Sequence, residues 1–288
     1  MNIKFPIAFM KMSGTGNDFI IIDHRKKFIP LEFRAAFAKA VCQRKFSVGA
    51  DGLILIQNSD QADFSWDFYN ADGSSAEMCG NGARCAARFA YMKKIAPAAM
   101  RFETIAGIIE AEVVDHSVKL KMTQPEGLAL DLKIDFGAND QTIHFINTGV
   151  PHAIFFVKDN RETPIVNWGS AIRFHEKFQP AGTNANFVEV IDRKTLSVRT
   201  YERGVENETM ACGTGAVGAA LIAAILRQVD PPVTVITSGG EKLIIHFSFE
   251  NTAPPVITDV YLEGPASLIY EGQLEPEALR TLQPKPGS

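Results

Sequence analysis

Short apolar runs bounded by turn residues recur along the whole chain, and runs of this length predict β-strands. A longer stretch, 81–94, instead repeats apolar residues at the helical period, a second helix is predicted over 215–227, and a further outer helix is predicted over 31–43. The predicted strands are 5–10, 19–23, 53–57, 64–69, 100–104, 108–114 and 118–122, then 143–147, 154–158, 187–191, 197–202, 233–237 and 243–249.

The helix predicted over 215–227 is apolar on nearly every face, which is typical of a helix buried on all sides. Each half of the chain therefore places many short strands around one buried helix. This pattern predicts an α+β fold of two pseudo-symmetric halves, each a curved, mostly antiparallel sheet wrapped around a central helix.

The two halves also match in sequence at a nearly constant offset. Gly149 follows Gly14 by 135 positions, and Cys212 follows Cys79 by 133. The glycines that follow each cysteine match at the same offset, and so do several strand residues in the same order. Ordered matches of this kind indicate a duplicated unit.

The repeat divides the chain near a segment rich in glycine and proline. We expect an N-terminal half over 1–126 that carries Cys79 and a C-terminal half over 127–265 that carries Cys212. The polar, Pro-rich end, 275–288, is expected to be a disordered tail.

Composition and charge exclude several classes of protein, among them nucleic-acid-binding and membrane-spanning proteins. The chain has 288 residues, 46% of them hydrophobic and 22% charged, which is an ordinary globular balance. A net charge of −4 gives no basic surface for a nucleic acid. No apolar run is long enough to span a bilayer, and no signal-peptide pattern opens the chain. We therefore expect a cytoplasmic protein without nucleic-acid or membrane partners.

The cysteines are too few for a disulfide scaffold, and no two have the spacing of a zinc or dithiol site. The histidines form no ligand cluster, so no metal is expected. Cys42 and Cys85 are expected to be buried, structural side chains. Cys79 and Cys212 differ, because each stands at the mouth of a predicted helix and is followed by Gly-x-Gly.

That position has two physical consequences. The free N–H groups at a helix start, uncrowded next to glycine, form an anion site. The same positive end of the helix favours thiolate over thiol. A pair of thiols suits the inversion of a stereocentre next to a carboxylate, because one base removes a proton from one face while the other returns it to the opposite face.

Other uses of a glycine-rich turn before a helix agree less well with the sequence. No Walker phosphate loop occurs, and the G-x-G-x-x-G string at 213–218 lacks the βαβ context of a dinucleotide site. A cysteine protease needs one thiol with a partnered histidine, not two equivalent thiols. A redox dithiol remains open.

Several strings resemble the diaminopimelate epimerase family. They are N-x-D-G-S at 70–74, C-G-N-G-x-R at 79–84, E-R-G at 202–204 and E-T-x-A-C-G-T-G at 208–215. Residues 12–19 and 184–187 also match its pattern, and the resemblance runs from about residue 8 to about residue 271. It implies an enzyme without pyridoxal phosphate or metal. Such an enzyme interconverts the LL and meso forms of diaminopimelate, in lysine and peptidoglycan biosynthesis.

The resemblance also assigns roles to residues. It implies that Cys79 and Cys212 are the two acid–bases and that His152 and Glu202 tune their pKa values. It implies a fold of two similar halves, with the strand 266–272 returning to the first half. The substrate-binding residues that it implies are Asn17, Asn70, Gly80, Asn81, Asn186, Glu202, Arg203, Gly213 and Thr214.

Three departures from the family pattern lie away from the thiols. Val150 replaces an amide residue, Gly52 replaces a frequent glutamine, and the segment 204–208 is one residue longer. The first two leave open a racemase of broader specificity, for example on glutamate. A proline racemase-like enzyme, a phenazine-pathway isomerase and a non-catalytic amino-acid binding protein are further alternatives. We also expect a homodimer formed through exposed sheet surface.

Overall fold

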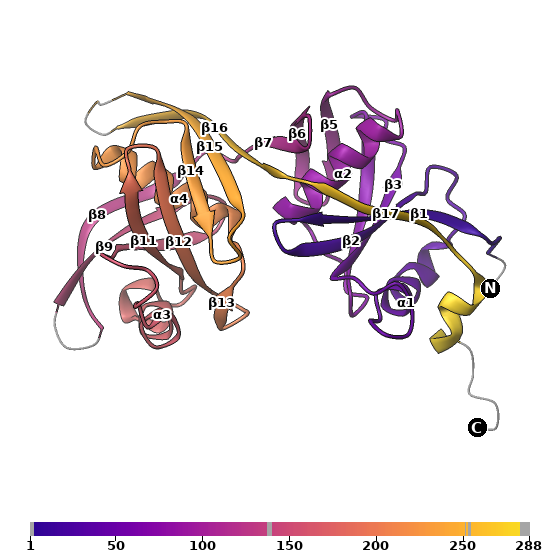
Figure 1. The fold of residues 1–288 in the computed structure, drawn as a ribbon, viewed down its shortest axis with the longest axis horizontal. Helices are drawn as coiled ribbons and strands as arrows, with labels where there is room; N and C mark the ends of the chain where they lie inside the picture. Colours follow the sequence, from indigo (N-terminus) through magenta and orange to yellow (C-terminus); the bar gives the residue numbers. More distant parts are fainter. Residues whose placement is uncertain (1–2, 137–139, 251, 253–254, 283–288) are drawn as a thin grey trace. The chain divides into compact units, whose positions relative to one another are not determined.

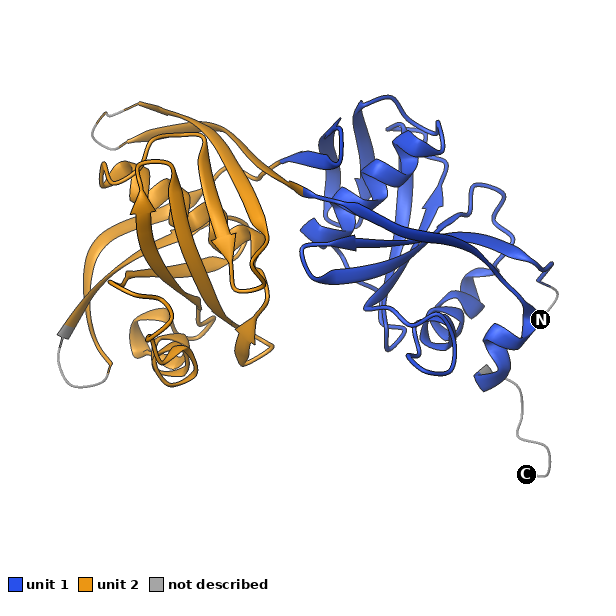
Figure 2. Cartoon of the chain, in the orientation of Figure 1, with its two compact units in different colours: residues 1–120, 265–288 blue, residues 121–264 orange. Residues whose placement is uncertain are grey.

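The structure is a computed structural model that describes residues 3–136, 140–250, 252 and 255–282. The chain forms two compact units, which Figure 2 colours separately. Unit 1 comprises Met1–Leu120 together with Pro265–Ser288, and unit 2 comprises Lys121–Gly264. The chain therefore passes from one unit to the other twice, at 120–121 and at 264–265.

Unit 1 is a curved sheet with strand order β17-β1-β2-β3-β4-β5-β6-β7 (Figure 1). Neighbouring strands are antiparallel except for the parallel pairs β2–β3 and β4–β5. The strands are β1 (Ile7–Gly14), β2 (Asn17–Asp23), β3 (Gly52–Gln57), β4 (Phe64–Asn70), β5 (Ala99–Thr104), β6 (Gly107–Val114), β7 (Ser117–Lys121) and β17 (Ser267–Leu274), and the helices are α1 (Leu31–Val41) and α2 (Gly80–Met92).

Unit 2 repeats this plan with strand order β8-β9-β10-β11-β12-β14-β15-β16, and β13 pairs with one end of β12. Its parallel pairs are β10–β11 and β12–β14. The strands are β8 (Glu126–Asp135), β9 (Asp140–Asn147), β10 (Pro151–Phe156), β11 (Asn184–Asp192), β12 (Thr195–Glu202), β13 (Asn207–Thr209), β14 (Val233–Thr237), β15 (Lys242–Glu250) and β16 (Val256–Pro265). The helices are α3 (Ile165–Phe174), η1 (Glu176–Phe178) and α4 (Gly213–Ile225).

Alternation along the central strands builds a core on each face of each sheet, since successive side chains point to opposite faces. In β2, Phe19 and Ile21 pack against α2, whereas Ile20 and Ile22 belong to the core that includes α1. Unit 2 follows the same rule. Ile154 of β10 and Val188 of β11 pack with α4, and their neighbours pack with α3.

The strand orders confirm the predicted α+β class with two pseudo-symmetric halves, each a sheet around a central helix. One strand shows how the repeat is completed. The strand next to β1 is β17, which comes from the end of the chain, whereas the strand next to β9 is β8, which directly precedes it. Unit 1 therefore obtains its outer strand only after unit 2 is finished.

Three segments differ from the sequence expectations. The segment expected to join the halves contains β8, and the boundary lies at 120–121 instead of 126–127. The tail expected over 275–288 is wrong for 276–282, because Pro276–Leu282 form the short helix η2 and Leu279 is buried; residues 283–288 lie outside the described residues. Helix α3 was not predicted, since its apolar stripe is short and Gly169 interrupts it.

In α3, Gly169 allows a close approach. A Cβ at this residue would collide with the side chain of Tyr201 on β12, so glycine lets the helix lie close to the sheet. No helix among the residues that the structure describes is both long and apolar enough to cross a membrane.

Candidate active site

Cys79 is the N-cap residue of α2, the central helix of unit 1. Its backbone is extended, with φ −150° and ψ 116°, and the helix begins at the next residue. The N–H of Gly82 donates to Cys79 Sγ at 3.5 Å, so the sulfur takes the place of the usual capping oxygen. The thiol is half-buried and lies at the positive end of the helix dipole, as the sequence predicted.

A chain of amide groups lies next to this cap. Asn81 donates from Nδ2 to Asn17 Oδ1 at 2.6 Å, and Asn17 donates from Nδ2 to Asp51 Oδ2 at 3.2 Å. Asp51 in turn accepts from Arg44 at 3.0 Å. Two residues implied by the resemblance, Asn17 and Asn81, are thus brought together in unit 1 although they are far apart in sequence.

Arg84 anchors this chain from inside the core and was not singled out by the sequence analysis. The side chain is fully buried and donates from Nη2 to Asn81 Oδ1 at 2.7 Å and to the hydroxyl of Thr15. It also donates to the carbonyl oxygens of Gly80, at 3.4 Å, and of Pro265, at 3.3 Å. One signal in the sequence could have identified Arg84: it interrupts an otherwise apolar helical stripe. A buried cation needs several hydrogen-bond acceptors, so an arginine in that place predicts a buried polar network.

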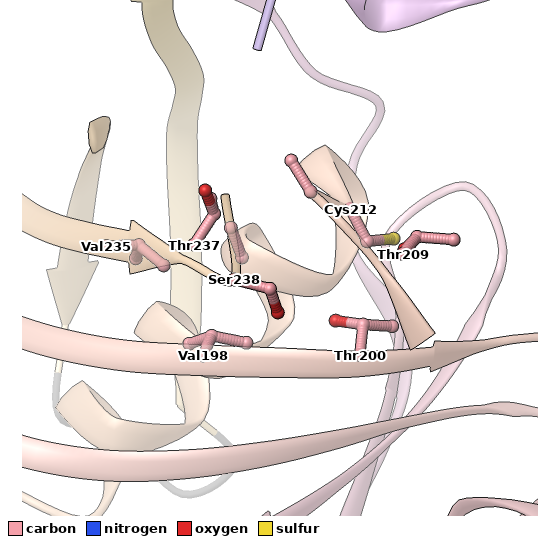
Figure 3. Close-up of a pocket in the computed structure, with 9 residues that line it drawn as sticks. Val198, Thr200, Thr209, Cys212, Val235, Thr237 and Ser238 are labelled. Atoms are coloured by element: carbon pink, nitrogen blue, oxygen red, sulfur yellow. The ribbon is translucent and has the colours of Figure 1, made fainter. Parts of the chain in front are cut away.

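Cys212 is the N-cap residue of α4, again in extended conformation, with φ −122° and ψ 108°. It lines a recess with Thr200 of β12 and Thr209 of β13 (Figure 3). Burial raises the pKa of the Cys212 thiol to about 11, and the negative charge of Glu202 acts in the same direction. Hydrogen bonds from Thr214 and from the N–H of Gly215 partly oppose this rise. Cys212 is therefore a protonated thiol in this state.

Beside Cys212, Thr214 connects the thiol to His152. Cys212 Sγ lies 3.6 Å from Thr214 Oγ1, which lies 2.9 Å from His152 Nε2. His152 is fully buried, and burial lowers its pKa to about 3; the positive charge of Arg203 lowers it further. The imidazole is thus neutral at physiological pH. Glu202 acts on the Cys212 thiol through its charge, whereas His152 is connected to that thiol through Thr214.

Asn186 supports the other side of the imidazole. Its Nδ2 lies 3.1 Å from His152 Nδ1 and donates to the carbonyl of Ala153 at 3.0 Å. Its Oδ1 accepts from the hydroxyl of Thr200 at 2.9 Å. The side chain is fully buried and engaged with protein groups on both polar atoms. In this structure Asn186 contacts His152, Ala153 and Thr200, and the substrate contact that the resemblance implies stays a prediction.

The two units put different side chains on equivalent positions. His152 follows Asn17 by 135 residues; Asn17 is the first residue of β2, and His152 is the second residue of β10. Asn81 and Thr214 are each the second residue of their helix. The bond between Asn81 and Asn17 is therefore the counterpart of the bond between Thr214 and His152.

The remaining predicted residues lie near the ends of strands and helices. Asn70 is exposed at the end of β4, where Nδ2 donates to Ser74 at 3.0 Å. Arg203 is half-buried and donates to the carbonyl of Ala181 at 2.9 Å. Glu202 ends β12, and Gly80 and Gly213 open α2 and α4.

A second residue that the sequence analysis missed is Thr148. Its hydroxyl donates to the carbonyl oxygen of Thr214 at 2.9 Å and so ties the turn before β10 to the start of α4. Val150, at a departure from the family pattern, lies half-buried in the same turn. The signal for Thr148 was its place in the Asn-Thr-Gly string that repeats the Met-Ser-Gly string of the first half.

Gly52 has a packing explanation. A Cβ there would lie 2.6 Å from Phe68 Cε2 and 2.9 Å from the Tyr69 carbonyl, so the site has no room for a side chain.

Cys42 and Cys85 are buried, as predicted, and burial raises the pKa of Cys42 to about 12. Among the described residues, no three His, Cys, Asp or Glu side chains cluster as metal ligands would.

Comparison with known proteins gives one family. A family model described as diaminopimelate epimerase matches residues 9–127 and 144–269. A diaminopimelate epimerase of Aquifex aeolicus is 45% identical over 289 positions, covering 95% of this chain and 99% of that protein. One from Archaeoglobus fulgidus is 42% identical over 287 positions, covering 95% of this chain and 98% of that protein.

Solved structures show the same fold at low sequence identity. A phenazine biosynthesis protein of the PhzF family from Bacillus anthracis gives a TM-score of 0.70 at 15% identity, covering 94% of this chain and all (100%) of that chain. A hydroxyproline epimerase from Agrobacterium vitis, with bound trans-4-hydroxy-L-proline, gives 0.64 at 14% identity, covering 97% of this chain and 96% of that one.

Proposed function

The chain belongs to the diaminopimelate epimerase family, and we propose that Cys79 and Cys212 are the acid–base pair with which it inverts the α-carbon of diaminopimelate. The enzyme interconverts the LL and meso forms of that amino acid. The single observation that carries the proposal is the placement of both cysteines as N-caps of the two central helices. No other pair of nucleophilic side chains among the described residues repeats in this way.

The proposed reaction moves one proton off the substrate and one onto it. One cysteine, as thiolate, takes the α-hydrogen, and the pair of electrons left on carbon delocalises into the carboxylate. The other cysteine, as thiol, then gives its proton to the opposite face. The half-buried Cys212 thiol suits the donor role in the resting enzyme, since burial and the charge of Glu202 hold its proton.

The helix starts suit the charge that develops during this reaction. We assign the reacting carboxylate to the backbone N–H groups of Gly80, Asn81, Gly213 and Thr214, because free N–H groups at helix starts stabilise an anion without reorganising. For the second head group, Asn17, Asn70 and Glu202 offer oxygen acceptors for the ammonium, and Arg203 offers a cation for the carboxylate. Asn186, which the resemblance also implies as a substrate contact, supports His152 through its amide.

Isotope exchange tests the proposal directly. Wild-type enzyme in D₂O should place deuterium on the α-carbon while LL-diaminopimelate converts to the meso form. NMR measures both the deuterium content and the conversion. Cys79→Ala and Cys212→Ala should each abolish inversion, since either change removes one of the two proton carriers. Cys42→Ala is the matched control, because that buried thiol lies away from both helix starts and should leave inversion intact.

Full inversion by either single cysteine variant would overturn the two-base assignment.

A parallel reaction with L-glutamate tests the alternative of a racemase with broader specificity, which the half-buried Val150 keeps open. Only comparable rates on both amino acids would support that alternative. Tight binding of diaminopimelate without any exchange would instead favour a binding protein. Cytoplasmic location and a homodimer stay predictions, and analytical ultracentrifugation tests the second.

A further inference from the structure

The orientation of one buried amide fixes the direction of a hydrogen-bond chain in unit 2. A carbonyl oxygen can only accept, so the Asn186 atom 3.0 Å from the Ala153 carbonyl is the NH₂ group. The Asn186 oxygen is then free to accept from the Thr200 hydroxyl at 2.9 Å. Turning the amide over would place two oxygens that can only accept, those of Asn186 and Ala153, 3.0 Å apart, so the Ala153 carbonyl fixes the orientation.

This amide sets the tautomer of His152. The NH₂ group of Asn186 lies 3.1 Å from His152 Nδ1 and has only hydrogens to offer, so Nδ1 must present its lone pair. Since the buried imidazole is neutral, its single ring hydrogen is on Nε2. That hydrogen points to the Thr214 oxygen, which lies 2.9 Å away.

The threonine hydroxyl then keeps its own hydrogen for a second partner, and the Cys212 sulfur is within reach. Thr214 Oγ1 accepts from His152, and Cys212 Sγ lies 3.6 Å from it, within the range of a hydrogen bond to sulfur. The Thr214 backbone is held in place, because its carbonyl accepts from the Thr148 hydroxyl at 2.9 Å. Each donor in the chain Asn186, His152, Thr214 thus points toward the sulfur.

We propose that Thr214 is a positioning residue for the epimerisation, and that its hydroxyl, oriented by His152 and Asn186, donates a hydrogen bond to Cys212 whenever that sulfur is a thiolate. This inference rests on the proposed function of Cys212. It goes beyond the contact of the Thr214 backbone N–H with a substrate carboxylate, because it assigns a separate role to the side chain.

The proposal explains how Cys212 can both hold and release a proton. Burial and the nearby Glu202 carboxylate oppose the thiolate, and a donor aimed at sulfur offsets part of that cost once the proton has left. Arg203 is the charged group that faces His152, and its positive charge helps to keep the imidazole neutral. In unit 1, the equivalent Asn81 is instead engaged with Asn17 and Arg84.

The test measures the thiolate of Cys212 without turnover. In a Cys79→Ala background, Cys212 is alkylated with iodoacetamide at several values between about pH 8 and about pH 10, and mass spectrometry follows the Cys212 peptide. Thr214→Val, which keeps the shape but lacks the hydroxyl, should slow alkylation by about tenfold at each pH. Thr214→Ser, which keeps the hydroxyl, should restore it.

An alkylation rate for Thr214→Val equal to that of the parent would overturn the proposal, and so would a Thr214→Ser variant as slow as the valine variant. Thr214→Ala provides a second hydroxyl-free variant if the valine does not fold. In the presence of Cys79, Thr214→Val should lower kcat about tenfold with little change in KM, because the backbone N–H remains. A loss confined to KM would contradict the assignment.

These outcomes separate the two proposals. Alkylation needs no substrate, so the role of Thr214 is decided even if the enzyme fails to invert diaminopimelate. Conversely, normal alkylation in Thr214→Val together with inactive single cysteine variants would leave the two-base function standing and remove only the role of the threonine hydroxyl.

Discussion

The imidazole Nε2 of His152 lies 2.9 Å from the hydroxyl oxygen of Thr214, two residues beyond the Cys212 cap. In unit 1 the equivalent contact joins two amides, Asn81 and Asn17, at 2.6 Å. The duplicated scaffold therefore supplies the same contact twice with different chemistry. The second version includes an imidazole, and there the Thr214 hydroxyl also lies 3.6 Å from the sulfur of Cys212.

Gly215→Ala should be severely disruptive, because its Cβ would collide with Asn186 Oδ1 and would lie 3.3 Å from Cys212 Sγ. We expect a loss of about 2–4 kcal/mol in the free energy of unfolding, together with loss of inversion. Gly82→Ala is the matched control at the equivalent position of α2, where the nearest atom is the flexible Ile54 Cδ1 at 3.3 Å. Urea unfolding of both variants checks this, and equal losses would refute it.

Gly52→Ala should destabilise unit 1 by about 1–3 kcal/mol, because the new Cβ meets Phe68 Cε2 at 2.6 Å and the Tyr69 carbonyl at 2.9 Å. The double variant with Phe68→Leu should recover part of the loss, since a smaller side chain relieves one of the two clashes. The measurement is urea unfolding of both proteins. No recovery in the double variant would place the strain entirely on the backbone.

Arg84→Met should lower the free energy of unfolding by about 2–4 kcal/mol, because the buried acceptors on Thr15 and Asn81 lose their donor. It should also raise KM, since Asn81 loses an anchor. Arg88→Met is the control, because Arg88 lies one turn further along α2 and holds Ala266 and His116. The control should lose stability while KM stays unchanged. An Arg84→Met variant with unchanged KM would show that Arg84 does not position the substrate site.

Acid should weaken the fold through His152. Burial lowers its folded pKa to about 3 from an ordinary value near 6.5, so between these values the unfolded chain takes up a proton that the folded chain refuses. This residue therefore makes the free energy of unfolding fall by about 1.4 kcal/mol per pH unit below about pH 6.5. His24, with a pKa lowered to about 4, acts in the same direction.

His152→Gln should remove the contribution of His152 to the pH dependence of the free energy of unfolding and leave the contribution of His24. Urea unfolding at about pH 7.5 and about pH 5 measures it in both proteins. The variant should lose less stability on acidification than the wild type, by roughly 2 kcal/mol over that interval. An identical pH dependence would show that His152 takes up a proton in the folded chain as easily as in the unfolded one.

Features that depend on local order could be predicted from the amino-acid sequence alone. The short apolar runs in β2 and β10, the apolar helix 215–227 and the ordered repeat predicted the sheets, the central helices and their duplication, because the length and spacing of apolar residues report which segments are buried. It also placed Cys79 and Cys212 at helix starts, since a glycine-rich turn before an apolar period marks an N-terminus.

The roles of the buried residues on the central strands depend on contacts between distant parts of the chain. Asn186 and Gly52 occupy equivalent positions by strand register, opposite Ile154 and Phe19, yet one supports His152 and the other has no room for a side chain. The anchoring by Arg84 and the addition of β17 to unit 1 likewise join residues far apart in sequence. Such contacts follow from the register and packing of distant strands, and no local pattern encodes which partner a buried amide or guanidinium will meet.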